Sequence, residues 1–296
     1  MALCLAISLI ISRGWDPYDQ LVRYKWWYRN GYMSSTGNCF DIGASTRESL
    51  IEFERRQRAV ADKLQISIDE LDRTKDPKIL KEISTNCGGK GAAGNGSLMR
   101  LASVPLFFYQ YPEMAVQYSG ESSLTTHGDR KAYDACRLYG ALIVAAIRGE
   151  SKDELLNQNF YKKHRHWFGT EELIGDVKAI AEGSFKKPNG YEDGIRGKGF
   201  VLASLEAALW AFWSKNSFEE GVLAAINLGD DTDTTAAIYG QLAGACYGYN
   251  QLPDRWKKRV YAEKFIRCLS KWIVYEGDRW FQNQISTRTT PQRSKL

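Results

Sequence analysis

The sequence lacks several features that would assign it to a familiar class. No segment shows the sustained alternation of apolar and polar residues that is typical of half-buried strands, and no apolar run is long enough to span a bilayer. None of the six cysteines belongs to a Cys-x-x-Cys pair, so we expect free thiols in a reducing, cytoplasmic compartment. An excess of one charge is absent too. The 40 basic and 35 acidic residues are interspersed, and the net charge of +5 tolerates an anionic ligand without predicting a nucleic-acid partner.

Helical spacing of apolar residues, by contrast, is present almost everywhere. Apolar side chains recur at steps of three and four along residues 136–147 and again along residues 201–213. With no internal repeat and no long linker, this periodicity predicts one all-α domain of roughly ten or more helices over residues 1–285. We expect the charged segment 62–81 to lie at the surface, and we expect a monomer.

The two ends of the sequence differ in character. Residues 1–11 are apolar, but they have no basic segment before them and no cleavage site of small residues, so they predict a core helix rather than a signal peptide. Residues 286–296 are polar and basic and predict a flexible tail. The final Ser294, Lys295 and Leu296 would be a peroxisomal address in a eukaryotic protein.

An acidic run at residues 229–235, Gly-Asp-Asp-Thr-Asp-Thr-Thr, precedes an apolar helix. Carboxylates that are packed together and partly buried repel one another unless a cation compensates them. Oxygen ligands suit Mg2+, Mn2+ or Ca2+ better than Zn2+. The alternative is an ordinary helix start, where Asp and Thr are common caps. Three acids so close together exceed what capping needs, which favours a metal site. An EF-hand is excluded, because Gln241 and Leu242 stand where its closing Glu would be.

Small residues follow the acidic run at every fourth position: Ala236, Gly240, Gly244 and Gly248. Each glycine inside a helix costs about 1 kcal/mol relative to alanine. We therefore expect a central helix whose small-residue face is closely approached by another helix or by a ligand.

A glycine-rich loop at residues 87–97 leads into a helix that starts at Ser97. The loop contains the G-x-G-x-x-G spacing, but no apolar strand precedes it, so the dinucleotide-binding motif lacks its context. A Walker A loop is excluded, because Ser84 replaces its first glycine and no Ser or Thr follows Lys90. Exposed backbone N–H groups in such a loop bind phosphate. An ordinary glycine-rich turn is the alternative.

A second glycine-rich loop, residues 194–200, ends at Phe200. This ring could stack on a nucleobase or belong to the core, and the core is the default expectation. Asp41 lies between two apolar residues, where burial without a partner would be costly. We therefore expect Asp41 to be either hydrogen-bonded structurally or functional.

The chain has three histidines. His127 follows a hydroxyl-rich turn, and a single histidine in such a place is more often structural than catalytic. His164 and His166 stand in a cationic run that disfavours a divalent metal, so we expect both at the surface.

In combination, and above all in residues 229–244, these elements resemble the ADP-ribosylglycohydrolase family, which includes the dinitrogenase-reductase-activating glycohydrolases. The resemblance extends from Met1 to about Gly248. It implies a compact, orthogonal all-α helix bundle and a binuclear Mg2+ or Mn2+ site. The implied reaction is hydrolysis of the bond between ADP-ribose and an amino-acid side chain. The implied partners are an ADP-ribosylated protein or ADP-ribose, with no nucleic acid and no membrane.

The resemblance also implies roles for single residues. Asp231, Asp233 and Thr234 look like the metal ligands. Asp41 falls where the family has an acid close to the reacting ribose, and His127 occupies the place of a histidine that contacts the phosphate or the distal ribose. The implied substrate-binding residues are Ala92, Ala93, Gly94, Asn95, Gly96 and Ser97 for the diphosphate, with Gly199 and Phe200 for the adenosine.

One part of the family's pattern is missing. The family carries Thr-Asp-Asp-Thr just before the helix that here opens at Met1, and those residues supply the other half of the metal site. Residues 1–296 contain no such sequence. We therefore expect a misplaced start codon or a truncation. Two alternatives to a hydrolase follow: a non-catalytic binder of ADP-ribose or a related nucleotide, and a structural protein without a ligand.

Overall fold

The computed structural model describes residues 1–289, and every regular element in that range is a helix. One isolated β-bridge joins Gly94 to Phe200 within these residues, which form no sheet. The predicted all-α fold is therefore confirmed, as is the expectation of ten or more helices.

The helices fall into three consecutive groups along the chain. The first group comprises α1 (Ala2–Ser12), α2 (Pro17–Asn30), α3 (Ala44–Leu64), α4 (Ile68–Arg73) and α5 (Pro77–Leu80). The second comprises α6 (Gly96–Met99), α7 (Ser103–Phe108), α8 (Pro112–Leu124), α9 (Arg130–Ile147), α10 (Lys152–Leu155), α11 (Phe160–Lys163), the 3-10 helix η1 (Arg165–Phe168) and α12 (Gly175–Ala181). The third comprises α13 (Val201–Ser214), α14 (Phe218–Ile226), α15 (Thr232–Tyr247), the 3-10 helix η2 (Tyr249–Gln251), α16 (Asp254–Lys257) and α17 (Glu263–Thr289).

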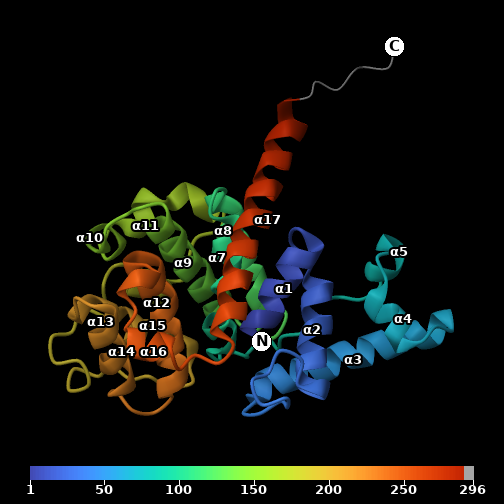
Figure 1. Cartoon of the computed structure of the whole chain (residues 1–296), viewed down its shortest axis with the longest axis horizontal. Coiled ribbons are helices and arrows are strands. Elements are labelled where there is room, and N and C mark those ends of the chain that lie inside the picture. The colour runs from blue at the N-terminus through green and yellow to red at the C-terminus, as the bar shows by residue number, and fades with distance from the viewer. Residues whose placement is uncertain (290–296) are drawn as a thin grey trace.

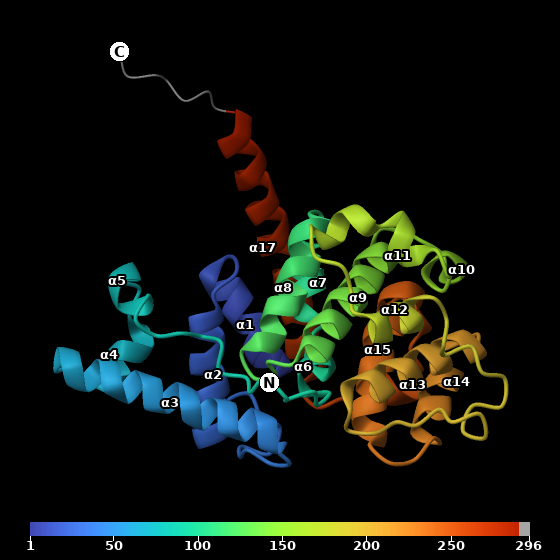
Figure 2. The same cartoon turned by 180° about the vertical axis from the view of Figure 1, so that it is seen from behind.

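Helix α9 forms the centre of the fold. Its residues from Asp134 to Ala146 are all buried, and a helix that is buried on every side belongs in a core. It packs against α7 and α8 on one side and against α13 and α15 on the other, as Figure 2 shows. The one carboxylate inside this helix, Asp134, is compensated by Arg137 at 2.9 Å. The central helix thus links the second and third groups.

The remaining helices extend from this centre in different directions. In both views α3, α4 and α5 lie at one side of the molecule, and α13 and α14 lie at the opposite side (Figures 1 and 2). Helix α17 crosses the body against α7 and α1 and then projects beyond it. It continues to Thr289, so residues 286–289 are helical, and the tripeptide 294–296 lies outside the described residues.

Local sequence signals account for many helix ends. Asp16 caps α2, with Pro17 in the first turn, and Gly31 ends the same helix with a φ of 64° that suits glycine. A capping box formed by Ser151 and Glu154 starts α10. These signals fix where the two helices begin and where α2 ends.

The apolar N-terminal segment is a core helix, as predicted. In α1 the side chains of Cys4, Leu5, Leu9 and Ile10 are buried. No helix within residues 1–289 combines the length and the apolar character needed to cross a bilayer.

One of the two histidines expected at the surface is buried instead. His164 is buried rather than at the surface, because its imidazole lies between Phe160 and Trp167 and contacts the Glu150 carboxylate at 2.8 Å. The charge of that acid compensates the cationic run around it. His166 is exposed, as expected.

The small-residue face of α15 meets no other helix among the described residues, so approach by a ligand is the part of that expectation that stays a prediction. A Cβ built on Gly240 or Gly244 would meet no atom within 4 Å among the described residues. The buried face of the helix instead carries Ile238, Tyr239 and Leu242, so α15 is central through that face while its glycines stay open.

Candidate functional site

The glycine-rich loop crosses the turn that carries His127, and the backbones of these two segments are in contact. The N–H of Gly128 donates to the carbonyl of Gly89 at 3.2 Å. A Cβ on Gly88 would lie 2.4 Å from the nitrogen of Gly128, and one on Gly128 would lie 2.3 Å from the oxygen of Gly88. Glycine is therefore required at both positions, and the crossing fixes the loop above the histidine.

The two glycine-rich loops pair with each other. The N–H of Asn95 donates to the carbonyl of Gly199 at 3.0 Å, and the N–H of Val201 donates to the carbonyl of Ala93 at 2.9 Å. These bonds make the antiparallel bridge between Gly94 and Phe200. The Phe200 side chain is 43% exposed, so the default expectation of a core residue is wrong, and an aromatic face is open beside the loop.

The acidic run joins this pair of loops through Asp231. Its N–H donates to the carbonyl of Gly197 at 2.8 Å. Its Oδ2 accepts a 2.7 Å hydrogen bond from Nδ2 of Asn95, which also donates to Oγ of Ser204 at 2.8 Å. Three segments far apart in the sequence, near residues 95, 198 and 231, therefore meet at one place.

The other predicted metal ligands are arranged differently. Asp233 is exposed, and its Oδ1 accepts from the N–H of Thr234 at 2.8 Å. The Thr234 side chain is buried and donates to Sδ of Met99 at 3.4 Å. Asp230 is exposed as well.

Within residues 1–289 no three His, Cys, Asp or Glu side chains gather in a way that could hold a metal ion. Two ions need carboxylates that bridge or face them, whereas here Asp233 faces solvent and Asp231 already binds an amide. These residues alone do not fit a binuclear site.

His127 lies under the glycine-rich loop and is only 3% exposed. Its ring is close to Gly94 and Gly96. A Cβ on Gly94 would lie 3.2 Å from Nε2, and a Cβ on Gly96 would lie 3.1 Å from Cε1. Its Nδ1 contacts Oγ1 of Thr126 at 2.8 Å. Burial, followed by the nearby positive charge of Arg100, lowers the imidazole pKa from 6.5 to about 3, so the ring is neutral.

The members of the predicted diphosphate loop offer backbone rather than side-chain donors. Among the described residues, the N–H groups of Gly94, Gly96 and Ser97 form no hydrogen bond to a protein acceptor. The Ser97 hydroxyl points away, because it is fully buried and contacts Ser123 and Cys136. Free N–H groups in a glycine loop are typical of anion sites.

Asp41 does not follow the reasoning from burial. Its side chain is exposed, as is that of Phe40 at 59%, and within residues 1–289 it forms no hydrogen bond or ion pair. Its φ of 47° is left-handed, which is uncommon for aspartate. It stands just before α3, whose Thr46 lies beside Gly96. The structure therefore places Asp41 on a segment that leads to the loop, and among the described residues it forms no hydrogen bond with the acidic run.

Three residues at this site escaped the sequence reasoning: Arg100, Thr126 and Ser204. Each is buried and bonds to a predicted site residue or its neighbour. For Thr126 the available signal was the group of hydroxyl residues at 122, 123, 125 and 126.

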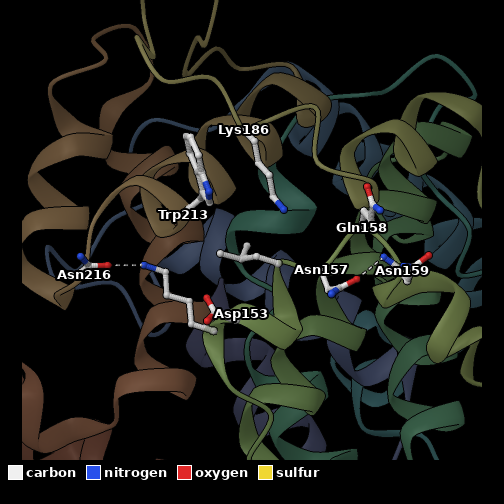
Figure 3. A pocket seen from close by; sticks show the side chains of 9 residues that line it. Asp153, Asn157, Gln158, Asn159, Lys186, Trp213 and Asn216 are labelled. Carbon is white, nitrogen blue, oxygen red and sulfur yellow. Dashed lines mark hydrogen bonds between the residues drawn. The ribbon is translucent and has the colours of Figure 1, made fainter.

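A separate cavity of about 450 Å3 lies between the turn after α10 and the end of α13. In Figure 3 the side chains of Lys186, Trp213 and Asn216 border it. The Lys152 ammonium, which also lines the cavity, donates to Oδ1 of Asn216 at 3.4 Å. No predicted site residue lines it.

Together, the fold and the site define an all-helical protein in which a glycine-rich loop with free N–H groups is held against an acidic helix start. The family model described as ADP-ribosylglycohydrolase matches residues 1–283, and the chain belongs to that family.

Known relatives agree with this assignment. The chain is 31% identical over 280 residues to "ADP-ribosylarginine hydrolase Tri1" of Serratia proteamaculans, covering 93% of this chain and 65% of the relative. It is 34% identical over 275 residues to the protein of the same name from Pseudomonas putida, covering 92% of this chain and 63% of the relative. The chain thus spans somewhat less than two thirds of these two relatives. A solved structure entitled "ADP-ribosylglycohydrolase-related protein complex" superposes with a TM-score of 0.69 at 32% identity, over 93% of this chain and 79% of that one.

Proposed function

We propose that this protein is an ADP-ribosyl hydrolase, which removes ADP-ribose from a modified protein side chain. The observation that carries the proposal is the hydrogen bond between Asn95 and Asp231, because it fixes an anion-binding loop beside an acid. A diphosphate and a ribose need those two kinds of group side by side. The names of the two Tri1 relatives suggest an arginine linkage as the first substrate to test.

Binding of the ADP-ribosyl group would use residues that the fold brings together where the two glycine-rich loops meet the acidic run. The free N–H groups of Gly94 and Gly96 would donate to the diphosphate, and Phe200 would stack on the adenine. Asp231 would accept from a ribose hydroxyl. We propose this division of roles because each group is open to a ligand at the same junction of loops.

Cleavage at the ribose passes through an oxocarbenium-like state and needs a positioned water. We propose Asp41 as the base or orienting acceptor for that water. Its exposed carboxylate has no protein partner among the described residues, so it is free to take a proton. Movement of the segment before α3 would have to bring it to the ribose.

A Mg2+ or Mn2+ requirement is part of the proposal, with Asp231, Asp233 and Thr234 as the ligands this chain would contribute. Because these oxygens do not form a binuclear site by themselves, we assign no reaction step to a metal. We propose that stable metal binding needs further carboxylates beside them. Without such carboxylates, the second candidate function is a non-catalytic ADP-ribose binder, which the absence of a metal cluster within residues 1–289 favours.

Calorimetry with ADP-ribose, followed by assay of ADP-ribose release from an ADP-ribosylated arginine substrate, tests the proposal. Both are done with Mg2+, with Mn2+ and with a chelator. Metal-dependent release supports the hydrolase, binding without release supports the binder, and absence of binding refutes both.

A matched pair of variants tests the site itself. Asp231→Asn removes the charge beside Asn95 but keeps an acceptor for its amide, and we expect ADP-ribose to bind about tenfold more weakly. Asp230→Asn removes a neighbouring charge that is exposed and whose side chain forms no hydrogen bond or ion pair among the described residues, and we expect no change. Equal effects of the two substitutions would contradict the assignment.

A further inference from the structure

A buried guanidinium lies directly beneath the glycine-rich loop. The Arg100 side chain is 1% exposed and donates to the carbonyl of Gly96 at 3.2 Å, to the carbonyl of Ser122 at 3.2 Å and to Oγ1 of Thr126 at 2.6 Å. Its cationic carbon lies 5.0 Å from the centre of the Tyr24 ring. Among the described residues no carboxylate pairs with it. An uncompensated buried charge is expensive to retain, so its place under an anion-type loop calls for a functional reason.

The contacts of Arg100 decide the direction of the next hydrogen bond. Oγ1 of Thr126 accepts from the guanidinium, which can only donate. The Thr126 side chain is fully buried, and within residues 1–286 the only other hydrogen-bonding partner of Oγ1 is Nδ1 of His127. Because a buried hydroxyl left without an acceptor is costly, the hydroxyl donates to Nδ1. Nδ1 is then unprotonated, and the neutral ring carries its proton on Nε2.

The protonated nitrogen faces the loop. A Cβ placed on Gly94 would lie 3.2 Å from Nε2, and one on Gly96 would lie 3.4 Å from it. No protein acceptor among the described residues takes the Nε2 proton. The donor therefore lies against Gly94 and Gly96, whose own N–H groups form no hydrogen bond among the described residues.

We propose that Arg100 is a positioning residue, which acts through Thr126 to hold His127 as the Nε2–H tautomer, so that the imidazole presents one fixed donor to the anionic ligand of the glycine-rich loop. Charge and donor are divided between two residues. The guanidinium supplies the positive charge from below, and the imidazole supplies a directed N–H without a charge of its own. Such fixed donors bind an anion without reorganising. This role deepens the proposed function and rests on it for the identity of the ligand.

Nuclear magnetic resonance of the ligand-free protein tests the tautomer. With 15N-labelled histidine, long-range proton–nitrogen correlations report which ring nitrogen carries the proton in each of the three histidines. His164→Gln and His166→Gln identify the signals of His164 and His166 by their loss. We expect the remaining signal, from His127, to show the Nε2–H form between pH 6 and 8. A predominant Nδ1–H form would overturn the proposal.

Substitutions of two neighbouring threonines test the relay. Thr126→Val removes the hydroxyl and keeps the branched shape, so we expect His127 to become a mixture of tautomers and ADP-ribose to bind about tenfold more weakly. Thr126→Ser keeps the hydroxyl and should restore both. Thr125→Val is the matched control, because its Oγ1 also contacts Arg100, at 3.3 Å, but does not contact His127. It should leave the tautomer unchanged.

Arg100→Lys keeps the charge but loses the fork that reaches Gly96 and Thr126 together. We expect the His127 tautomer to relax in this variant as in Thr126→Val. Should the lysine variant fail to fold, the threonine variants decide the question, since they leave the guanidinium in place. A Thr126→Val variant with unchanged tautomer and unchanged affinity overturns the proposal.

Failure of this inference and failure of the proposed function give different results. If the wild-type protein binds no ADP-ribose but shows the Nε2–H form, which relaxes in Thr126→Val, the relay stands and the proposed function falls. If ADP-ribose binds while His127 shows the Nδ1–H form, the relay falls and the function stands.

Discussion

The contribution of the hydrogen bond between Asn95 and Asp231 can be measured by replacing the amide group of Asn95 with a carboxylate. Asn95 is 8% exposed, and its Nδ2 donates to Asp231 and to Ser204. Asn95→Asp keeps the shape of the side chain, removes these donors and places a second carboxylate at the site. The substitution therefore turns an attraction into a repulsion with no change in volume.

The size of the effect follows from the geometry. Losing a hydrogen bond to a charged acceptor costs about 1.5–3 kcal/mol. Two carboxylates about 4 Å apart repel by about 4 kcal/mol at an effective dielectric constant of 20, and the half-exposed position of Asp231 reduces that value. We therefore expect the free energy of unfolding to fall by about 4 kcal/mol in Asn95→Asp at pH 8, against about 2 kcal/mol in the control Asn95→Ala.

Urea unfolding between pH 4.5 and 8 is the assay. At acidic pH one proton shared by the two carboxyl groups replaces the lost donor, so the gap between Asn95→Asp and Asn95→Ala should close. Mg2+ or Mn2+ should narrow the gap at pH 8 if the junction can hold a cation. The reasoning is refuted if the two variants are equally stable at every pH.

Three further predictions concern the core and the loop. The pKa of His127 is about 3 in the folded protein and near 6.5 in the unfolded protein. As the pH is lowered from 6.5, the unfolded state takes up the proton first, so the free energy of unfolding decreases. Urea unfolding should show a loss of about 2 kcal/mol between pH 6.5 and 5, absent in His127→Gln. Gly88→Ala should lower the melting temperature strongly because its Cβ would meet backbone at 2.4 Å, whereas Gly240→Ala, with open space, should raise stability by about 1 kcal/mol. Asp134→Asn leaves the buried Arg137 without its carboxylate and should cost about 3–5 kcal/mol in chemical unfolding.

The fold was largely predictable because helical periodicity is a local property. The stripes at 136–147 and 201–213 became α9 and α13, and the apolar start became α1. The position of His164 could not be predicted, because the partner that compensates it, Glu150, is supplied by the folded chain and not by the neighbouring sequence. The cationic neighbours of His164 in the sequence suggested an exposed side chain, but tertiary packing buries it.

The site was predictable in its loops but less so in its side chains. Glycines mark where backbones must approach closely, and Gly88 and Gly128 do meet. Which side chain lies under the loop depends on the crossing of distant helices, so Arg100 was not singled out. Asp41 shows the opposite error. The apolar neighbours of Asp41 suggested burial. Phe40 is itself exposed, however, so the carboxylate stays in solvent and there is no desolvation cost.

The case for a metal also depends on burial. Clustered carboxylates require a cation when the medium around them is apolar, because repulsion between them is then strong and unscreened. In this structure Asp230 and Asp233 face solvent, where screening makes their mutual repulsion small. The same side of α15 carries Gly240, which has open space above it. If a further segment or a ligand covered this face, it would fill the space above Gly240 and would also exclude the solvent that now screens Asp230 and Asp233. The carboxylates would then need a cation. Metal affinity should therefore rise with whatever covers α15, and it should be weak in the chain measured alone.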